Sequence, residues 1–145
     1  MMIMMRVTLA VASLTCWLIA EPSHGQQATA TEVYTLRERC AKMAAAVFQK
    51  DYTFSDNTGG MKRLFNYENH YSQKQNRCFF LEMGIFIEKG KVSKQLRLLD
   101  LHDNKEYGTY FDTDAQPQYV LCTVGEQRCN TEQEWRQLTK PYLED

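Results

Sequence analysis

The chain of 145 residues carries almost no net charge, because 17 lysines and arginines face 18 aspartates and glutamates. It therefore lacks the global positive field that draws many proteins onto nucleic acid. The charges are unevenly spread: residues 61–97 hold eight basic and three acidic side chains, whereas residues 98–145 hold four basic and ten acidic ones. We expect folding to bring these halves together, so that their charges compensate internally; held apart, each would offer a charged face to a partner.

Motifs of the common enzyme classes are missing as well. The sequence has no phosphate-binding loop, no dinucleotide-binding glycine pattern and no nucleophile elbow. It also contains no D-x-D-x-D-G calcium loop, no N-x-S/T glycosylation acceptor and no internal repeat. These absences make catalysis a weaker expectation than binding, although they do not exclude an enzyme.

The N-terminal apolar run is too short to cross a membrane. Val7–Ala20 has 14 residues, whereas a spanning helix needs about 20. Arg6 precedes this run and the segment EPSHG follows it, which is the layout of a secretory signal peptide. The pattern predicts cleavage after Gly25, a periplasmic or extracellular location without a permanent membrane anchor, and one exported domain formed by residues 26–145.

Four cysteines remain after removal of such a signal peptide: Cys40, Cys78, Cys122 and Cys129. An even number in an oxidising compartment favours disulfides, and three pairings are possible. We favour Cys40 with Cys78 and Cys122 with Cys129, because only six residues separate the second pair. A metal site is not expected, because structural zinc sites usually use two closely spaced pairs.

The rest of the sequence predicts an α+β fold. Apolar residues recur at helical spacing over 31–50, after a capping box made by Thr29 and Glu32. A second capping box, Thr131 with Glu134, predicts a short helix that Pro141 ends near residue 140. Between the helices, runs rich in aromatic and β-branched residues predict about four strands, at 78–88, 95–102, 107–113 and 119–124.

Short polar turns join these strands, so we expect an antiparallel meander. Phe65 and Tyr67 suggest a further short extended piece. The leucine pattern shifts register between Leu98 and Leu99, which predicts a β-bulge. We expect the helices to cover one face of the sheet and to leave the other face in contact with water.

The candidate reactive residues have structural explanations that compete with a catalytic role. His70 and Cys78 would make a nucleophilic pair only if the cysteine were reduced and exposed. His70 and His102 with acidic turn residues could serve a small hydrolase or a zinc site. The acidic turn residues are Asp100, Asp103, Glu106, Asp112 and Asp114. Turn chemistry explains the acidic residues adequately, so we assign no catalytic, cofactor-binding or metal-binding residue and no cofactor.

Four stretches resemble a group of small exported bacterial proteins without an assigned function. They are Cys40–Phe48, Asn69–Phe79, the run YVLC at 119–122, and the C-x-x-x-x-E-W pattern from Cys129 to Trp135. The resemblance implies a shared framework of four cysteines and gives no activity.

The sequence therefore predicts an exported, disulfide-stabilised interaction module, with a protein partner in the cell envelope. The open side of the sheet and its tyrosines would provide the binding surface. A small hydrolase that uses His70 or His102, and a small-ligand carrier with a pocket between sheet and helix, are the alternatives.

Overall fold

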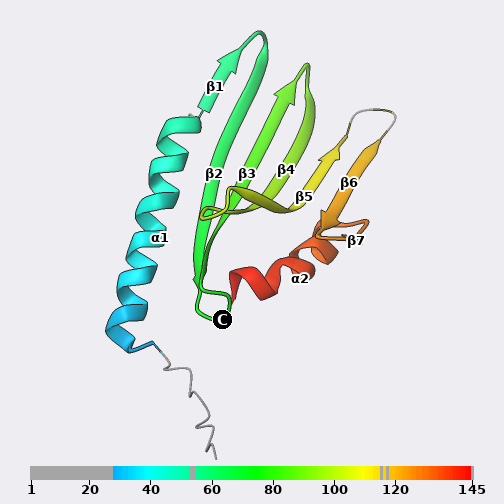
Figure 1. Ribbon diagram of the computed structural model, residues 1–145. Helices are drawn as coiled ribbons and strands as arrows, with labels where there is room; N and C mark the ends of the chain where they lie inside the picture. The colour runs from blue at the N-terminus through cyan, green and yellow to red at the C-terminus, as the bar shows by residue number, and fades with distance from the viewer. Residues whose placement is uncertain (1–27, 53–54, 115, 117, 145) are drawn as a thin grey trace, which may run out of the picture.

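The structure, a computed structural model, describes residues 28–52, 55–114, 116 and 118–144, and it contains two helices and one sheet (Figure 1). The predicted signal peptide and its cleavage site after Gly25 lie outside these residues. The elements are α1 (Ala30–Asp51), β1 (Ser55–Thr58), β2 (Met61–Ser72), β3 (Arg77–Glu88), β4 (Lys91–Asp100), β5 (Lys105–Thr113), β6 (Tyr119–Val124), β7 (Gln127–Arg128) and α2 (Glu132–Leu143).

The sheet is an antiparallel meander in which the strands lie side by side in chain order, as predicted. The predicted count of about four strands is too low, because the sheet has seven strands. Six of them have four or more residues, and β7 has two. The strands β1 and β7, whose residues are SDNT and QR, carry no apolar pattern that predicts a strand. The short extended piece expected around Phe65 and Tyr67 is part of the 12-residue strand β2. These polar strands form through pairing with a neighbour rather than through burial of apolar side chains.

Two-residue turns close the first and third hairpins. Gly59 and Gly60 have φ angles of 66° and 81°, and Lys89 and Gly90 have φ angles of 51° and 80°. Positive φ at both turn positions gives the backbone twist that matches the twist of paired strands. The sheet therefore ends in tight hairpin tips on this side.

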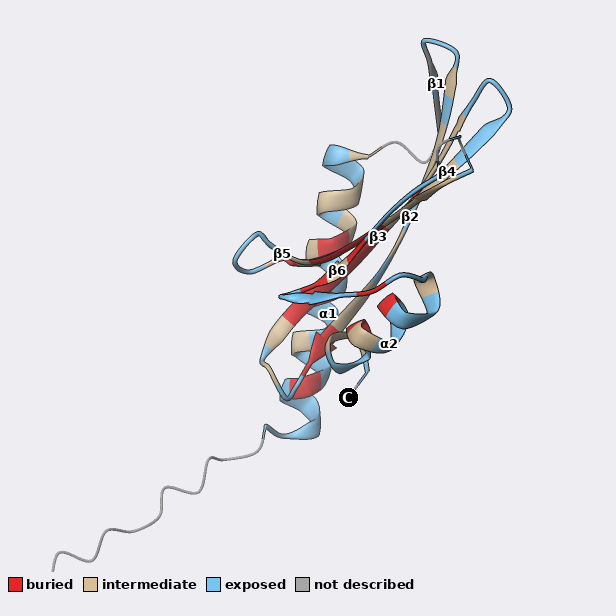
Figure 2. Cartoon of the chain, turned by 90° about the vertical axis from the view of Figure 1, so that its right-hand side faces the viewer, coloured by how far each residue is buried: buried red, intermediate tan, exposed pale blue. Residues whose placement is uncertain are grey.

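The two helices pack on opposite faces of the sheet (Figure 2). Phe80 of β3 lies near Tyr52 at the end of α1, with ring centroids 6.3 Å apart. The preceding residue, Phe79, meets Tyr142 of α2 at 5.3 Å. Successive residues of a strand point to opposite faces. We call these faces the α1 face and the α2 face, and the expectation that both helices share one face is wrong.

Coverage of both faces explains the leucine pattern in β4. Leu98 lies opposite Leu81 on the α2 face, and Leu99 lies opposite Phe80 on the α1 face. The predicted register shift between Leu98 and Leu99 is present, but the extra residue is Tyr107 of β5. The strand β4 itself alternates regularly. Consecutive apolar residues reflect burial on both sides, a pattern also found in the strands of parallel sheets.

The larger core lies between the sheet and α2. Trp135 is fully buried there, and its indole N–H donates to the backbone oxygen of Thr123 at 3.2 Å. The other buried residues of this core are Phe79, Leu81, Leu96, Leu98, Tyr110, Cys122, Val124 and Cys129. A smaller core under α1 contains Cys40, Tyr71 and Cys78.

Both predicted disulfides are present. Cys40–Cys78 joins α1 to β3, and Cys122–Cys129 joins β6 to the residue that follows β7. Each cross-link therefore fixes a local element to the sheet.

The capping box at the start of α1 is also confirmed, since Thr29 and Glu32 bond to each other reciprocally.

The helix α2 begins after Thr131, as predicted, but it does not end at residue 140. It continues through Pro141 to Leu143, and the N–H of Glu144 closes the last turn on the oxygen of Lys140 at 2.9 Å. Proline removes one backbone donor from a helix, and near a helix end that loss affects a single hydrogen bond. None of the helices in the described part of the chain is long and apolar enough to cross a membrane.

The basic and acidic halves of the sequence do compensate each other. Arg77 bonds to Asp100 and Asp103, Lys94 bonds to Glu132 at 2.5 Å, and Arg97 bonds to Glu106 at 2.8 Å. Each of these ion pairs joins a cation from residues 61–97 to an acid from residues 98–145. The predicted internal compensation is confirmed for these residues.

Candidate functional site

The helix α1 covers only part of its face of the sheet. Its last rings reach β2: Phe48 lies 4.7 Å from Tyr67, and Tyr52 lies 5.3 Å from Phe65, between ring centroids. Tyr52 is the C-cap residue of α1. The strands continue beyond this point toward the hairpin tips, as Figures 1 and 2 show. In the part of the chain that the structure describes, the α1 face is therefore open over this end of the sheet.

A groove of about 380 Å³ lies on this open part of the α1 face. The strand register places its lining on one side: Arg63 lies opposite Phe86, Phe86 opposite Ser93, and Gln95 opposite Phe111. Directly opposite residues of antiparallel strands point to the same face. The full lining is Met61, Arg63, Phe65, Phe86, Ser93, Gln95 and Phe111, from β2, β3, β4 and β5.

Gly84 of β3 lies beneath the groove, between β2 and β4. It lies opposite Phe65 on one side and Gln95 on the other. A Cβ atom at this position would lie only 3.1–3.2 Å from the rings of Phe86 and Phe65. Because the side chain is missing, these two rings close over the backbone edge to face, with their centroids 5.7 Å apart. The glycine thus lets aromatic carbon form the floor of the groove.

A charged network borders the groove on the side of α1. The carboxylate of Glu82 is buried and accepts hydrogen bonds from the hydroxyl of Tyr52 at 2.7 Å and from Arg97 at 3.1 Å. Arg97 also donates from Nε to Glu106 at 2.8 Å. Burial, together with the bond to Glu82, raises the pKa of the Tyr52 hydroxyl well above its ordinary value. The charged groups of this network are thus paired with one another, and they form a polar border beside the groove.

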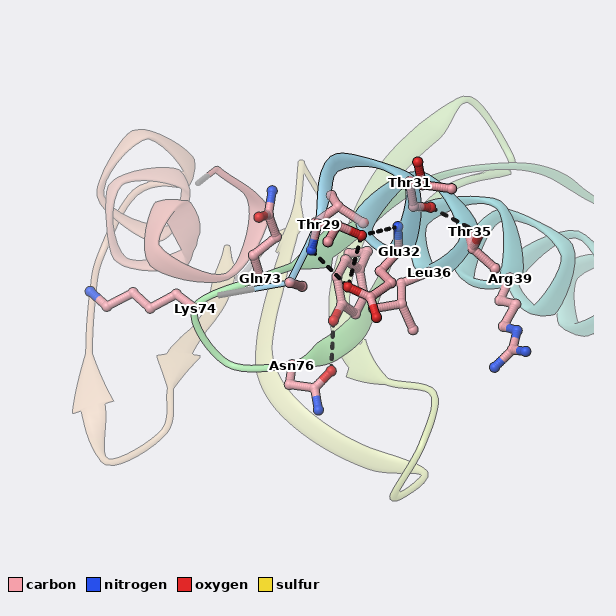
Figure 3. Close-up of a pocket in the computed structure, with 12 residues that line it drawn as sticks. Thr29, Thr31, Glu32, Thr35, Leu36, Arg39, Gln73, Lys74 and Asn76 are labelled. Atoms are coloured by element: carbon pink, nitrogen blue, oxygen red, sulfur yellow. Dashed lines mark hydrogen bonds between the residues drawn. The ribbon is translucent and has the colours of Figure 1, made fainter. Parts of the chain in front are cut away.

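A second, larger hollow lies between the start of α1 and the turn that joins β2 to β3 (Figure 3). Several of its polar groups already serve the fold. The backbone N–H of Thr29 donates to Glu32 at 2.7 Å, and the hydroxyl of Tyr71 donates to Asn76 at 2.6 Å. The hydroxyl of Thr35 donates to the oxygen of Thr31 at 3.0 Å. Caps and turns explain these groups, so the groove is the stronger candidate.

The candidate residues around His102 build a turn. The Nδ1 atom of His102 accepts the backbone N–H of Cys78 at 3.2 Å, and its own backbone N–H donates to Asp100 at 2.8 Å. Asp100 is fully buried and also binds Arg77, which binds Asp103 as well. These contacts give His102, Asp100 and Asp103 a structural role.

The remaining candidates are placed elsewhere in the sheet. His70 lies on β2 opposite Phe79, on the α2 face, and Cys78 is oxidised in its disulfide. Asp112 accepts the hydroxyl of Tyr110 at 3.2 Å, and Asp114 accepts the N–H of Val92 at 2.7 Å. In the described ranges, no group of three or more histidine, cysteine or acidic side chains is placed to hold a metal ion.

The sequence predicts one fully open sheet face, which is wrong, and it does not identify the residues of this groove. Phe65, Phe86 and Phe111 come from three strands, and each is unremarkable within its own segment. The usable signal was Gly84 inside the most apolar strand, because glycine in a strand often marks a close approach of neighbouring groups. The three phenylalanines come together only through the register of neighbouring strands, which the sequence does not show.

The two disulfides agree with the expected framework of four cysteines. The wider resemblance to small exported bacterial proteins stays a prediction. Comparison of the chain with family models, curated proteins and solved structures gives no match.

Proposed function

We propose that the protein is an exported binding module, and that the groove on the α1 face holds an apolar segment of a protein partner in the cell envelope. The observation that carries this proposal is the aromatic lining of a groove that α1 leaves uncovered. The two disulfides support export, because such bonds persist mainly in oxidising compartments.

The lining favours an apolar side chain of the partner. Phe65, Phe86 and Phe111 supply apolar surface, while Ser93 and Gln95 supply hydrogen-bonding groups at the edge. Burying one aromatic or aliphatic side chain contributes about 1.5–3 kcal/mol, so one or two anchors are enough for weak, specific binding.

An open groove fits a peptide segment better than a small carried ligand. Small-molecule sites usually enclose most of the ligand surface, whereas this groove lies on one face of a sheet and has no cover among the described residues. The hydrolase alternative gains no support from His102, which is a structural part of its turn.

A peptide selection tests the proposal. A library of random linear peptides is selected on the oxidised protein, and bound sequences are measured against wild type, Phe86→Ala and Phe111→Ala. We expect apolar peptides, and we expect each substitution to weaken binding about tenfold or more through the loss of ring contact.

The control is Tyr34→Ala, which removes an exposed ring on α1, 70% accessible to solvent, far along the sequence from the groove. Near-UV circular dichroism checks that each variant keeps its packing. Peptides that bind Phe86→Ala and Phe111→Ala as tightly as wild type would show that the groove is not the binding surface.

A further inference from the structure

The ladder of hydrogen bonds between β3 and β4 ends on a side chain instead of the backbone. The N–H of Leu101 donates to the oxygen of Cys78 at 2.9 Å. In a regular antiparallel pair, the return bond would join the N–H of Cys78 to the oxygen of Leu101. Here Nδ1 of His102 accepts that N–H, at 3.2 Å. The imidazole ring therefore takes the place of a backbone carbonyl.

This bond requires a neutral imidazole ring. A backbone N–H can only donate, so Nδ1 of His102 must present its lone pair, and the proton of the ring lies on Nε2. A protonated ring carries a hydrogen on both nitrogens and cannot accept the N–H of Cys78. Histidine is the side chain that ordinarily changes charge between about pH 5 and pH 8. The His102 side chain is 48% exposed, so protons from the solvent reach it.

An acceptor for the protonated ring is already in place. Oδ1 of Asp100 lies 3.7 Å from Nδ1 of His102 and accepts the backbone N–H of His102 at 2.8 Å. The other oxygen of this carboxylate bonds to Arg77, which also bonds to Asp103. Because Asp100 is fully buried, its position is fixed. It holds the turn through the backbone and keeps one oxygen beside the ring.

Among the described residues, Asp100 is the charged group within ion-pair distance of His102. Titratable side chains on the neighbouring strands have other partners. Lys105 of β5 lies over the ring of Tyr107, with its Nζ 5.2 Å from the ring centroid, and Tyr71 of β2 donates its hydroxyl to Asn76 at 2.6 Å. The α1 side chains in this small core, Leu36 and Cys40, carry no charge.

We propose that His102 is a pH-sensitive switch at the start of β3. The neutral ring accepts the N–H of Cys78. The protonated ring releases this N–H and forms an ion pair with Asp100, which needs only a small rotation because the two atoms are 3.7 Å apart. The proton comes from the solvent and returns to it, so the step needs no other reactant.

The switch acts at the point where α1 is attached to the sheet. Cys78 is fully buried and forms its disulfide with Cys40 of α1. A buried N–H that loses its acceptor is unfavourable, so this end of β3 should open locally at acidic pH. Tyr71, opposite Cys78 on β2, lines the hollow shown in Figure 3. That hollow is thus the region whose shape should depend on pH.

This inference goes beyond the proposed function and is independent of it. The groove lies at the other end of β3, around Phe86, whereas the switch acts on Cys78, the second residue of that strand. Acidic pH should therefore open the start of β3 without removing the groove. A failure of either proposal leaves the other standing.

NMR spectroscopy of the purified protein with intact disulfides tests the switch between pH 8 and pH 5. At pH 8, the nitrogen shifts of His102 should show a neutral ring with its proton on Nε2. Toward pH 5, the exchange protection of the Cys78 amide, corrected for the intrinsic effect of pH, should fall about tenfold or more. Its midpoint should coincide with protonation of the ring. The amide of Phe80, two residues further along β3, is the internal reference and should change less.

His102→Asn is the matched variant, because its side-chain oxygen can accept the same N–H but does not titrate in this range. It should keep the Cys78 amide protected at pH 8 and abolish the fall in protection toward pH 5. His102→Ala has no acceptor, so the Cys78 amide should exchange rapidly at both ends of the range. His70→Gln removes the other histidine of the described residues and should leave the fall unchanged.

Four results would each overturn the proposal. The first is a Cys78 amide that is equally protected at pH 8 and pH 5 although the His102 ring has taken up its proton. The second is a fall in protection that persists in His102→Asn, and the third is one that disappears in His70→Gln. The fourth is a neutral His102 ring with its proton on Nδ1, because that nitrogen could not then accept the N–H.

Discussion

Gly108 makes room for Trp135, the largest buried side chain of the α2 core. A Cβ atom at this position of β5 would lie 3.0 Å from the backbone oxygen of Thr123 and 3.4 Å from Nε1 of Trp135. That same oxygen accepts the indole hydrogen bond. The close approach of indole and strand therefore depends on a missing methyl group.

We expect Gly108→Ala to reduce the free energy of unfolding by about 1–3 kcal/mol, the usual cost of overpacking. Gly84→Ala is the comparison, because its new methyl group would meet only the half-buried rings of Phe65 and Phe86, which can shift. It should cost less than Gly108→Ala. Urea denaturation measures both values, and an equal or reversed order would show that the backbone contact is not the decisive one.

Tyr52 should make the free energy of unfolding decrease as the pH becomes alkaline. Its hydroxyl donates to the buried carboxylate of Glu82, and burial together with this bond raises the pKa of Tyr52. A phenol with a raised pKa keeps its proton up to a higher pH in the folded state than in the unfolded state. Its contribution is complete below the unfolded value of about 10 and is lost as the pH rises above it.

We expect Tyr52→Phe to lower stability by about 1 kcal/mol near pH 7, because Glu82 loses one of its donors. The gap between wild type and Tyr52→Phe should narrow as the pH rises above 10. Denaturation curves between pH 8 and pH 11 measure that gap. A constant gap would mean that the hydroxyl acts through packing alone.

At the level of elements, the disulfides contribute unequally. Cys40–Cys78 spans 38 positions and joins α1 to the centre of the sheet, whereas Cys122–Cys129 spans 7 positions within one hairpin. A cross-link that closes a longer loop restricts the unfolded chain more strongly. The helix that bounds the groove is thus secured by the more effective of the two bonds.

Replacing both Cys40 and Cys78 by alanine should cost about 4 kcal/mol, and replacing both Cys122 and Cys129 about 2.5 kcal/mol, on the loop-entropy estimate. Each double variant serves as the control for the other, because both lose one disulfide and gain two alanines. Chemical denaturation measures the difference. A larger loss for the short loop would show that local packing, not loop length, sets the contribution.

Elements with a local signal were predictable from the sequence, and features that arise from pairing were not. Thr29 with Glu32 located the start of α1, and the six residues between Cys122 and Cys129 suggested their disulfide. The strands β1 and β7 left no apolar pattern. The only sign of helices on opposite faces is a run of consecutive apolar residues such as Phe79 and Phe80, and strand propensity alone also explains such a run.

The candidate site was less predictable than the fold for the same reason. An aromatic groove needs Phe65, Phe86 and Phe111 on one face, and one-residue changes of register would send any of them to the other face. His70 and His102 are candidates only because of the chemistry of the imidazole group. His102 instead accepts a backbone N–H beside the Cys40–Cys78 disulfide.

In the described part of the molecule, the helices cover the middle of the sheet and leave its hairpin tips uncovered (Figures 1 and 2). Phe80 and Leu98 are fully buried, whereas Val92 and Lys89 are exposed. The groove belongs to the less covered end of the sheet. The proposed binding surface thus lies where the molecule has the least packing of its own.

Native-state hydrogen exchange at low protein concentration should reveal this gradient. Amides of Phe80 and Leu98 should exchange only through global unfolding, because both helices must leave the sheet before they open. Amides of Ile85 and Ile87, near the tip of the hairpin between β3 and β4, should exchange through local opening, with a free energy lower by at least about 2 kcal/mol, or about 30-fold in rate. Every one of these amides belongs to a strand with neighbours on both sides, so strand pairing alone predicts equal protection. Equal exchange rates at the two ends would mean that the helices add nothing to local stability, and the association between bare sheet and binding surface would then have no energetic basis.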